Sequence, residues 1–204
     1  MWMAITREVS PALASCELSH IPRIPIDAER AGAQHHDYLR TLEALGCRLV
    51  ILPAEPALPD SVFVEDVAIV LDEVAVMTRP GALSRRAEVA SVAKALGHYR
   101  TLLTIETPGN LDGGDVMRAG RTLYVGQSAR SNAEGIAQLS ALLNEHGYAV
   151  QGVPTRGCLH LKSAVTQISP IWAIMSSCWP ALMRSPTSAE RLRMMPAAGA
   201  AIFV

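Results

Sequence analysis

Three carboxylates fall within seven residues of this chain, at Asp60, Glu65 and Asp66. Their neighbours are mostly apolar and β-branched, which predicts a strand, and a strand would place Glu65 and Asp66 on opposite faces. At least one of them must then point where apolar side chains point, which is costly unless a cation meets it. The cluster is therefore a candidate binding site for a guanidinium or ammonium group. The alternative is that these carboxylates face solvent or pair with the chain's own arginines.

A second candidate is a Gly-Gly pair flanked by Asp112 and Asp115. Glycine has no Cβ, so another backbone or a ligand can come close to it. A strand rather than a helix follows the pair, which disfavours a dinucleotide site. The alternative is a turn capped by two aspartates.

His160 lies in the short apolar run 159–162, which predicts a strand, and is a candidate for acid–base chemistry. Histidine exchanges protons near neutral pH, and it needs an orienting acceptor such as Asp112. The alternative is a hydrogen-bonded histidine in the protein core.

Two arginines, Arg85 and Arg130, each precede a predicted helix and occupy equivalent places in a repeated pattern. Arginine binds carboxylates through two parallel hydrogen bonds. Together with the carboxylate cluster, the two arginines would bind a zwitterion, its cationic end on Asp and Glu and its carboxylate on Arg. Solvent-exposed loop arginines are the alternative.

Apolar residues at spacings of three and four predict helices over 35–45, 85–97 and 132–147, and Ser131 with Glu134 predicts a capping box before the third. Short β-branched runs between the helices predict strands over 48–52, 62–71, 74–77, 116–118, 123–125 and 148–153.

The second and third of these units align with each other. Ala87-Glu88 matches Ala133-Glu134, and the acidic segment at 65–67 resembles that at 114–116, which gives a period of about 46–50 residues. The pattern indicates repeated ββα modules around an axis or in a row, although α/β chains can reuse such patterns by chance.

Composition excludes several classes of protein. Of the 204 residues, 50% are apolar and 18% are charged, and the net charge is −1, so neither a disordered chain nor a partner such as nucleic acid or an acidic membrane is expected. The sequence has no apolar run of membrane-spanning length and no secretion signal, which predicts a cytoplasmic protein. The four cysteines form no CxxC pair, so neither a zinc ribbon nor a disulfide scaffold is expected.

Six segments in order resemble the dimethylarginine dimethylaminohydrolase family: PDSVFVED (59–66), TRPG (78–81), SRR (84–86), LDGGDV (111–116), VGQSARSN (125–132) and LHLKS (159–163). The resemblance covers about residues 15–168. It implies an α/β fold, a pentein-type propeller of five ββαβ modules that this chain would leave incomplete at its C-terminus.

The resemblance also implies roles for individual residues. Asp60, Glu65 and Asp66 would hold the guanidinium of a methylated arginine, Arg85 and Arg130 would bind its α-carboxylate, and the Leu18 backbone would contact its amino group. His160, supported by Asp112, would be the general acid and base. In that family a cysteine thiolate attacks the guanidinium carbon, and hydrolysis gives citrulline and a methylamine without metal or cofactor.

The sequence departs from the family in the segment that carries the nucleophile. The family has this cysteine in a Gly-Gly-x-Ser/His-Cys segment beyond the histidine, and none of Cys16, Cys47, Cys158 and Cys178 matches it. The composition changes at Ser169–Val204, so we expect a partial propeller at 1–168, an atypical tail at 169–204 from a frameshift or truncation, and a chain with little activity. The open strand edges of an incomplete ring favour association, including a homo-oligomer.

Two other functions remain open from the sequence. One is a related chemistry on the same scaffold, as in arginine deiminase or an amidinotransferase. The other is a non-catalytic scaffold that binds cationic amino acids.

Overall fold

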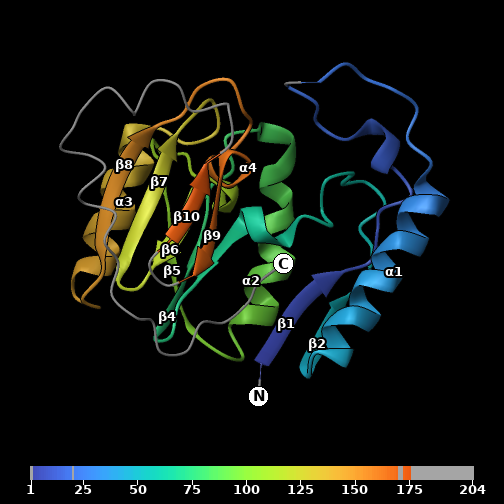
Figure 1. The fold of residues 1–204 in the computed structure, drawn as a ribbon, viewed down its shortest axis with the longest axis horizontal. Helices are drawn as coiled ribbons and strands as arrows, with labels where there is room; N and C mark the ends of the chain where they lie inside the picture. Colours follow the sequence, from blue (N-terminus) through green and yellow to red (C-terminus); the bar gives the residue numbers. More distant parts are fainter. Residues whose placement is uncertain (1, 20, 170–171, 176–204) are drawn as a thin grey trace.

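Two consecutive segments of the chain fold into the same ββαβ module in the computed structural model, which describes residues 2–19, 21–169 and 172–175 (Figure 1). The first module comprises β3 (Ala68–Val70), β4 (Val74–Met77), α2 (Val89–Leu96) and β5 (Thr101–Thr104). The second comprises β6 (Val116–Ala119), β7 (Thr122–Gln127), α3 (Ala133–Asn144) and β8 (Ala149–Pro154).

The two modules share one topology and one register. In each sheet the second strand is central, antiparallel to the first strand and parallel to the last, which it reaches through the helix. Corresponding strands begin 48 residues apart, at 68 and 116, 74 and 122, and 101 and 149. The repeat predicted from the sequence is therefore confirmed.

Partial modules lie on either side. β1 (Trp2–Arg7), α1 (Ala28–Ala44) and β2 (Cys47–Leu52) form a parallel pair with a helical crossover, like the last three elements of a module. β9 (Val165–Ser169) and β10 (Trp172–Met175) form an antiparallel hairpin, like its first two strands. This hairpin crosses the boundary expected after residue 168, and the rest of the expected tail, including Cys178, lies outside the described residues.

One helical turn precedes the first strand of each module. These turns are η2 (Val64–Val67), η4 (Gly113–Asp115) and α4 (Leu161–Ala164), and η4 packs against both of the others. The sequence predicted a strand over all of 62–71 and placed His160 inside a strand, and both predictions were wrong. A short apolar run does not distinguish a strand from a buried helical turn, because three or four residues are too few to show a period.

Other differences concern the ends of elements. α1 begins much earlier than predicted because the Asp27 carboxylate accepts a hydrogen bond from the Arg30 backbone nitrogen at 2.9 Å and caps the helix. The start of the second predicted helix is the separate turn η3 (Leu83–Glu88), and a short turn η1 (Leu13–Ser15) follows β1. The strands β1, β5, β9 and β10 were not predicted. Within the described residues, no helix combines the length and the apolar character needed to cross a bilayer.

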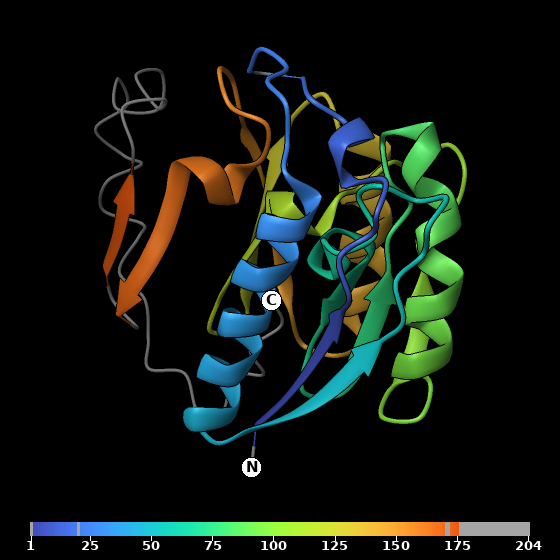
Figure 2. The ribbon, with the colours of Figure 1, turned by 90° about the vertical axis from the view of Figure 1, so that its right-hand side faces the viewer.

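Figures 1 and 2 show α1 and α3 on opposite outer sides of the molecule, with the sheets between them. The largest apolar cluster joins the two complete modules, and its fully buried members come from both: Leu71, Val76, Leu111, Leu123, Val125, Leu139 and Leu143. This cluster is therefore an interface between repeats, and a second cluster packs α2 and the sheet of the first module against β1 and β2.

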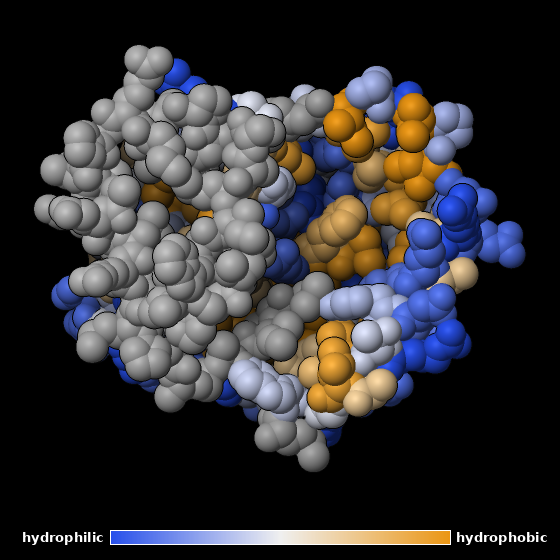
Figure 3. All heavy atoms as spheres, viewed as in Figure 1, coloured by the Kyte–Doolittle hydropathy of each residue, from blue (hydrophilic) through white to orange (hydrophobic). Residues whose placement is uncertain are grey.

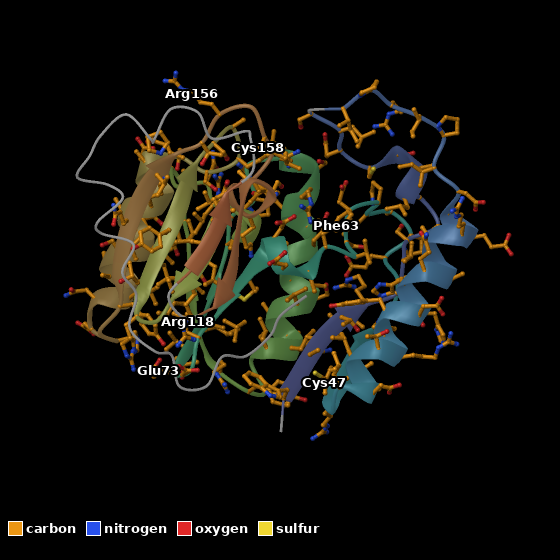
Figure 4. All side chains as sticks on the ribbon, in the orientation of Figure 1. Cys47, Phe63, Glu73, Arg118, Arg156 and Cys158 are labelled. Atoms are coloured by element: carbon orange, nitrogen blue, oxygen red, sulfur yellow. The ribbon has the colours of Figure 1, made fainter. Side chains whose placement is uncertain are left out.

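A polar network joins the same modules at the β3–β4 and β6–β7 turns. Arg118 pairs with Asp72 at 2.7 Å, Arg121 pairs with Glu73 at 2.5 Å, and both guanidinium groups lie over the ring of Tyr148. Hydrogen bonds from Arg121 and the Tyr148 hydroxyl lower the pKa of Glu73 to about 2. In Figure 4 the labelled Glu73 and Arg118 lie at the end of the molecule away from Cys158.

We predict that Leu123→Ala destabilises the protein by about 2–5 kcal/mol, because it leaves a cavity in the interface between modules. The exposed Leu83→Ala variant is the control and should stay within about 0.5 kcal/mol of the parent. Denaturant unfolding measures both. Equal effects of the two substitutions would contradict a core shared between the repeats.

Candidate active site

The centre of the candidate site is a contact between the starts of η4 and α4. His160 Nε2 lies 3.1 Å from Asp112 Oδ2, and both residues are buried, with exposures of 8% and 0%. The two residues are 48 positions apart, so they occupy the same place in successive modules. Burial disfavours the imidazolium, but the hydrogen bond to Asp112 and the charges of Asp66 and Asp115 outweigh it and raise the pKa of His160.

Asp66, in η2, lies on the other side of the imidazole. Its Oδ1 is 3.9 Å from His160 Nδ1 and accepts a hydrogen bond from the Gly114 backbone nitrogen at 2.9 Å. Both ring nitrogens of His160 therefore face carboxylates, and this arrangement favours a protonated ring.

Arg85 contacts the Asp66 carboxylate oxygen that does not face His160. Its Nη1 donates to Asp66 Oδ2 at 2.5 Å, and its Nε and Nη2 donate to the Glu88 carboxylate at 2.8–3.2 Å. Nη2 also donates to the backbone oxygens of Asp60 and Phe63. Burial opposes the charge on Arg85, but the bonds to Glu88 and the charge of Asp66 outweigh it and raise its pKa. Asp66 therefore pairs with one of the chain's own arginines, which is the alternative that the sequence left open. That Arg85 binds the α-carboxylate of a ligand stays a prediction.

The close packing of these residues requires glycine at two positions. A Cβ on Gly114 would lie 2.5 Å from His160 Nδ1 and 2.6 Å from Asp66 Oδ1, and a Cβ on Gly113 would lie 2.0 Å from the Glu65 carbonyl oxygen. The Gly-Gly pair noted in the sequence therefore lets η2, η4 and α4 meet.

The segment after β1 lies close to this centre. The Asp60 carboxylate accepts a hydrogen bond from the Glu17 backbone nitrogen at 3.0 Å, which places Leu18 beside the site. Arg130 also reaches this segment, because its Nη2 donates to Ser19 Oγ at 3.2 Å while its Nη1 lies 3.7 Å from Asp112 Oδ2.

Glu65 points differently from Asp66, because its carboxylate pairs with the Lys162 ammonium group. Burial raises the pKa of Asp60, and the hydrogen bond from Glu17 opposes that effect.

The structure thus brings Asp66, Asp112, His160 and Arg130 together, with Asp60 and Leu18 beside them and Glu65 in an ion pair. The ligand contacts expected of these residues stay predictions.

One atom from each of Asp66, Asp112 and His160 lies within 4.8 Å of the others, close enough to share a cation. Asp66 already pairs with Arg85, and Asp112 Oδ1 accepts a hydrogen bond from the Gly81 backbone nitrogen at 2.9 Å. The other Asp66 oxygen accepts from the Gly114 backbone nitrogen and the other Asp112 oxygen contacts the imidazole, so the arrangement suits proton transfer.

Sequence reasoning missed three supporting residues: Glu88, Ser131 and Asp115 as a buried acceptor. The sequence predicts Ser131 as a helix cap, and it gives Asp115 as a flank of the candidate Gly-Gly segment with a turn cap as the alternative. The cap of α3 is instead Asn132, whose side chain accepts from the Gly135 backbone nitrogen at 2.8 Å. Two adjacent residues that can both cap a helix give no sequence signal to tell them apart.

Figure 3 shows that the surface is hollowed between the segment after β1 and the rest of the molecule, with hydrophilic side chains inside the hollow. Figure 4 places Phe63 and Cys158 toward this region and Cys47 at the far end of β2. Phe63 is half exposed, and the Arg85 guanidinium lies 5.9 Å from its ring centre.

The family model described as N,N dimethylarginine dimethylhydrolase, eukaryotic, matches residues 23–180. The chain belongs to the dimethylarginine dimethylaminohydrolase (DDAH) family. It is 43% identical over 166 residues to a DDAH of Streptomyces coelicolor and 38% identical over 144 residues to a DDAH of Pseudomonas aeruginosa. These matches cover 81% and 70% of this chain, and they span 64% and 57% of the relatives.

Solved structures of the DDAH family show the same fold. A cysteine-to-serine mutant of the P. aeruginosa protein, complexed with citrulline, superposes with a TM-score of 0.86 at 31% identity, covering 93% of this chain and 74% of that one. The α/β fold of pentein-type modules predicted from the sequence is confirmed.

We predict that Gly114→Ala lowers the unfolding free energy of this protein by about 1–3 kcal/mol, because the added methyl group must displace His160 or Asp66. The control is Gly32→Ala in α1, where a Cβ has nothing within 4 Å; it should be neutral or raise stability by about 0.5–1 kcal/mol. Thermal unfolding of both variants checks this. An unaffected Gly114→Ala protein would contradict the close contact between η4 and α4.

A second prediction concerns pH. The folded-state pKa of His160 is raised, so its contribution to stability is complete below its unfolded pKa of about 6.5 and is lost as pH rises through the folded value. The unfolding free energy of the parent minus that of His160→Gln should therefore be larger at about pH 6 than at about pH 9. Denaturant titrations across this range measure the difference, and a constant or rising difference would contradict the assigned carboxylate partners.

Proposed function

We propose that this site binds the guanidinium group of a methylated arginine, and that the Asp112–His160 pair supplies the proton transfers of its hydrolysis to citrulline and a methylamine. The observation that carries the proposal is the buried contact of His160 with Asp112 beside Asp66, in a member of the DDAH family. The citrulline complex of the P. aeruginosa relative supports the same class of ligand.

The balance of buried charge supports a cationic ligand. The buried carboxylates around the site outnumber the buried arginines there; the carboxylates are Asp60, Asp66, Glu88, Asp112 and Asp115, and the arginines are Arg85 and Arg130. An imidazolium at position 160 offsets one more charge. A planar cation that donates hydrogen bonds to Asp66 would reduce the remaining excess, and a carboxylate oxygen can accept more than one hydrogen bond.

The acid–base role rests on the position of the imidazole. A guanidinium held on Asp66 would lie beside His160 Nδ1, while Asp112 holds Nε2. The raised pKa of His160 favours the protonated ring, which can protonate a departing amine and, once neutral, accept a proton from water.

The reaction also needs a thiolate to attack the guanidinium carbon. We assign this role to none of Cys16, Cys47 and Cys158, and Cys178 lies outside the described residues. The proposal for this chain is therefore ligand binding and acid–base chemistry, with little or no turnover until the thiolate is supplied.

Calorimetric titration with Nω,Nω-dimethylarginine tests the binding. We expect Asp66→Asn to weaken binding about tenfold or more, because it removes a charge-assisted hydrogen bond worth about 1.5–3 kcal/mol. Asp72→Asn, which breaks only the surface pair with Arg118, is the control and should bind like the parent. No detectable binding by the parent chain would contradict the proposal.

A citrulline assay with dimethylarginine and with arginine completes the test of this proposal. Binding with little citrulline release is the expected result. Normal turnover that survives His160→Gln would contradict the acid–base role, and release from arginine alone would favour a deiminase.

A further inference from the structure

Asp115 is a buried carboxylate that has no role in the proposed chemistry. It is 0% exposed, and its Oδ1 accepts a hydrogen bond from the Leu161 backbone nitrogen at 2.9 Å, directly after His160. Its Oδ2 accepts from the hydroxyl groups of Ser128 and Ser131 at 2.6 and 2.7 Å. Burial raises the pKa of Asp115, and these three hydrogen bonds oppose the rise.

The Ser131 hydroxyl makes a second hydrogen bond that the Ser128 hydroxyl does not share. It accepts from the Asp112 backbone nitrogen at 3.1 Å while it donates to Asp115. Because Asn132 caps α3, the Ser131 side chain is not needed there. One hydroxyl group thus connects the backbone of Asp112 with the carboxylate that holds the backbone after His160.

We propose that Ser131 and Asp115 are positioning residues that set the contact between Asp112 and His160. The chain of bonds runs from the Asp112 backbone through Ser131 and Asp115 to the Leu161 backbone, so it fixes both ends of the 3.1 Å contact. A side-chain pair from two different modules needs such support, because a shift of one module moves one partner alone.

The surroundings of His160 make its titration a direct readout of this geometry. The charged groups around it are Asp66, Asp112 and Asp115, with Arg130 close to the same Asp112 oxygen. Ser131→Ala and Ser128→Ala each remove one hydrogen bond to Asp115 and no charge, so a change in the titration of His160 in the first variant alone reports a change of position.

The experiment compares Ser131→Ala with Ser128→Ala. Both remove a hydroxyl donor from the same oxygen of Asp115, and only the first also removes the acceptor for Asp112. Ser128→Ala instead removes the acceptor for the backbone nitrogens of Arg130 and Ser131, so it also controls for a loosened turn. The imidazole of His160 is followed by nuclear magnetic resonance in the full chain with labelled histidine, and its signal is assigned from His160→Gln. We expect the pKa of His160 to fall toward its ordinary value in Ser131→Ala and to stay near the parent value in Ser128→Ala.

Two results would overturn the inference: an unchanged titration in Ser131→Ala, or equal shifts in the two serine variants. Asp115→Asn removes a charge as well as the acceptor for the Leu161 backbone, and it should lower the pKa of His160 further. If this variant does not fold, the comparison of the two serine variants still tests the inference. Equal losses of thermal stability in the serine variants, without a change in titration, would show a structural role only.

This inference concerns the same site as the proposed function and deepens it. Only the expected effect on catalysis rests on the proposed function. In a preparation that turns over dimethylarginine, Ser131→Ala should lower kcat about tenfold or more with KM unchanged. The titration of His160 needs no substrate, so a failure to bind dimethylarginine would contradict the proposed function and leave the titration result unaffected.

Discussion

The contact between Asp112 and His160 is the constraint on which the rest of the site depends. The two side chains occupy the same position in successive modules, so their distance is set by how the modules pack and not by local chain geometry. The packing needs a Gly-Gly pair at η4, because a side chain at Gly113 or Gly114 would collide with the neighbouring turn. The fold and the proposed chemistry therefore have the same requirement, which is that the backbones of the neighbouring turns approach closely at the centre of the site.

The buried charges around this contact fall into two groups. Arg85, Glu88 and Asp115 bond to side chains or backbone of neighbouring turns and hold those turns in place. His160 and Asp66 face each other across a longer gap of 3.9 Å. Buried ion pairs add little net stability because each ion loses its hydration, so their value here lies in fixing geometry.

The sequence predicted the repeat, the three helices and the residues that meet at the centre, because periodicity and motif order are local signals. It predicted a strand through Asp66 and around His160, where the structure has single helical turns, because such short runs carry no period. It left open that Asp66 pairs with an arginine but did not identify Arg85, and it did not predict that Ser131 bonds to Asp115, because both contacts depend on how the segments pack. Such contacts between modules leave no spacing to detect along the chain.

The exposed network at the turns of the first two modules has a further consequence. Arg118 and Arg121 pair there with Asp72 and Glu73 across two repeats, whereas the contacts at η4 are buried. Dissolved salt screens exposed charges far more strongly than buried ones. Raising the ionic strength would therefore weaken these exposed pairs more than the buried contacts at η4, while the apolar cluster continues to hold the two modules together.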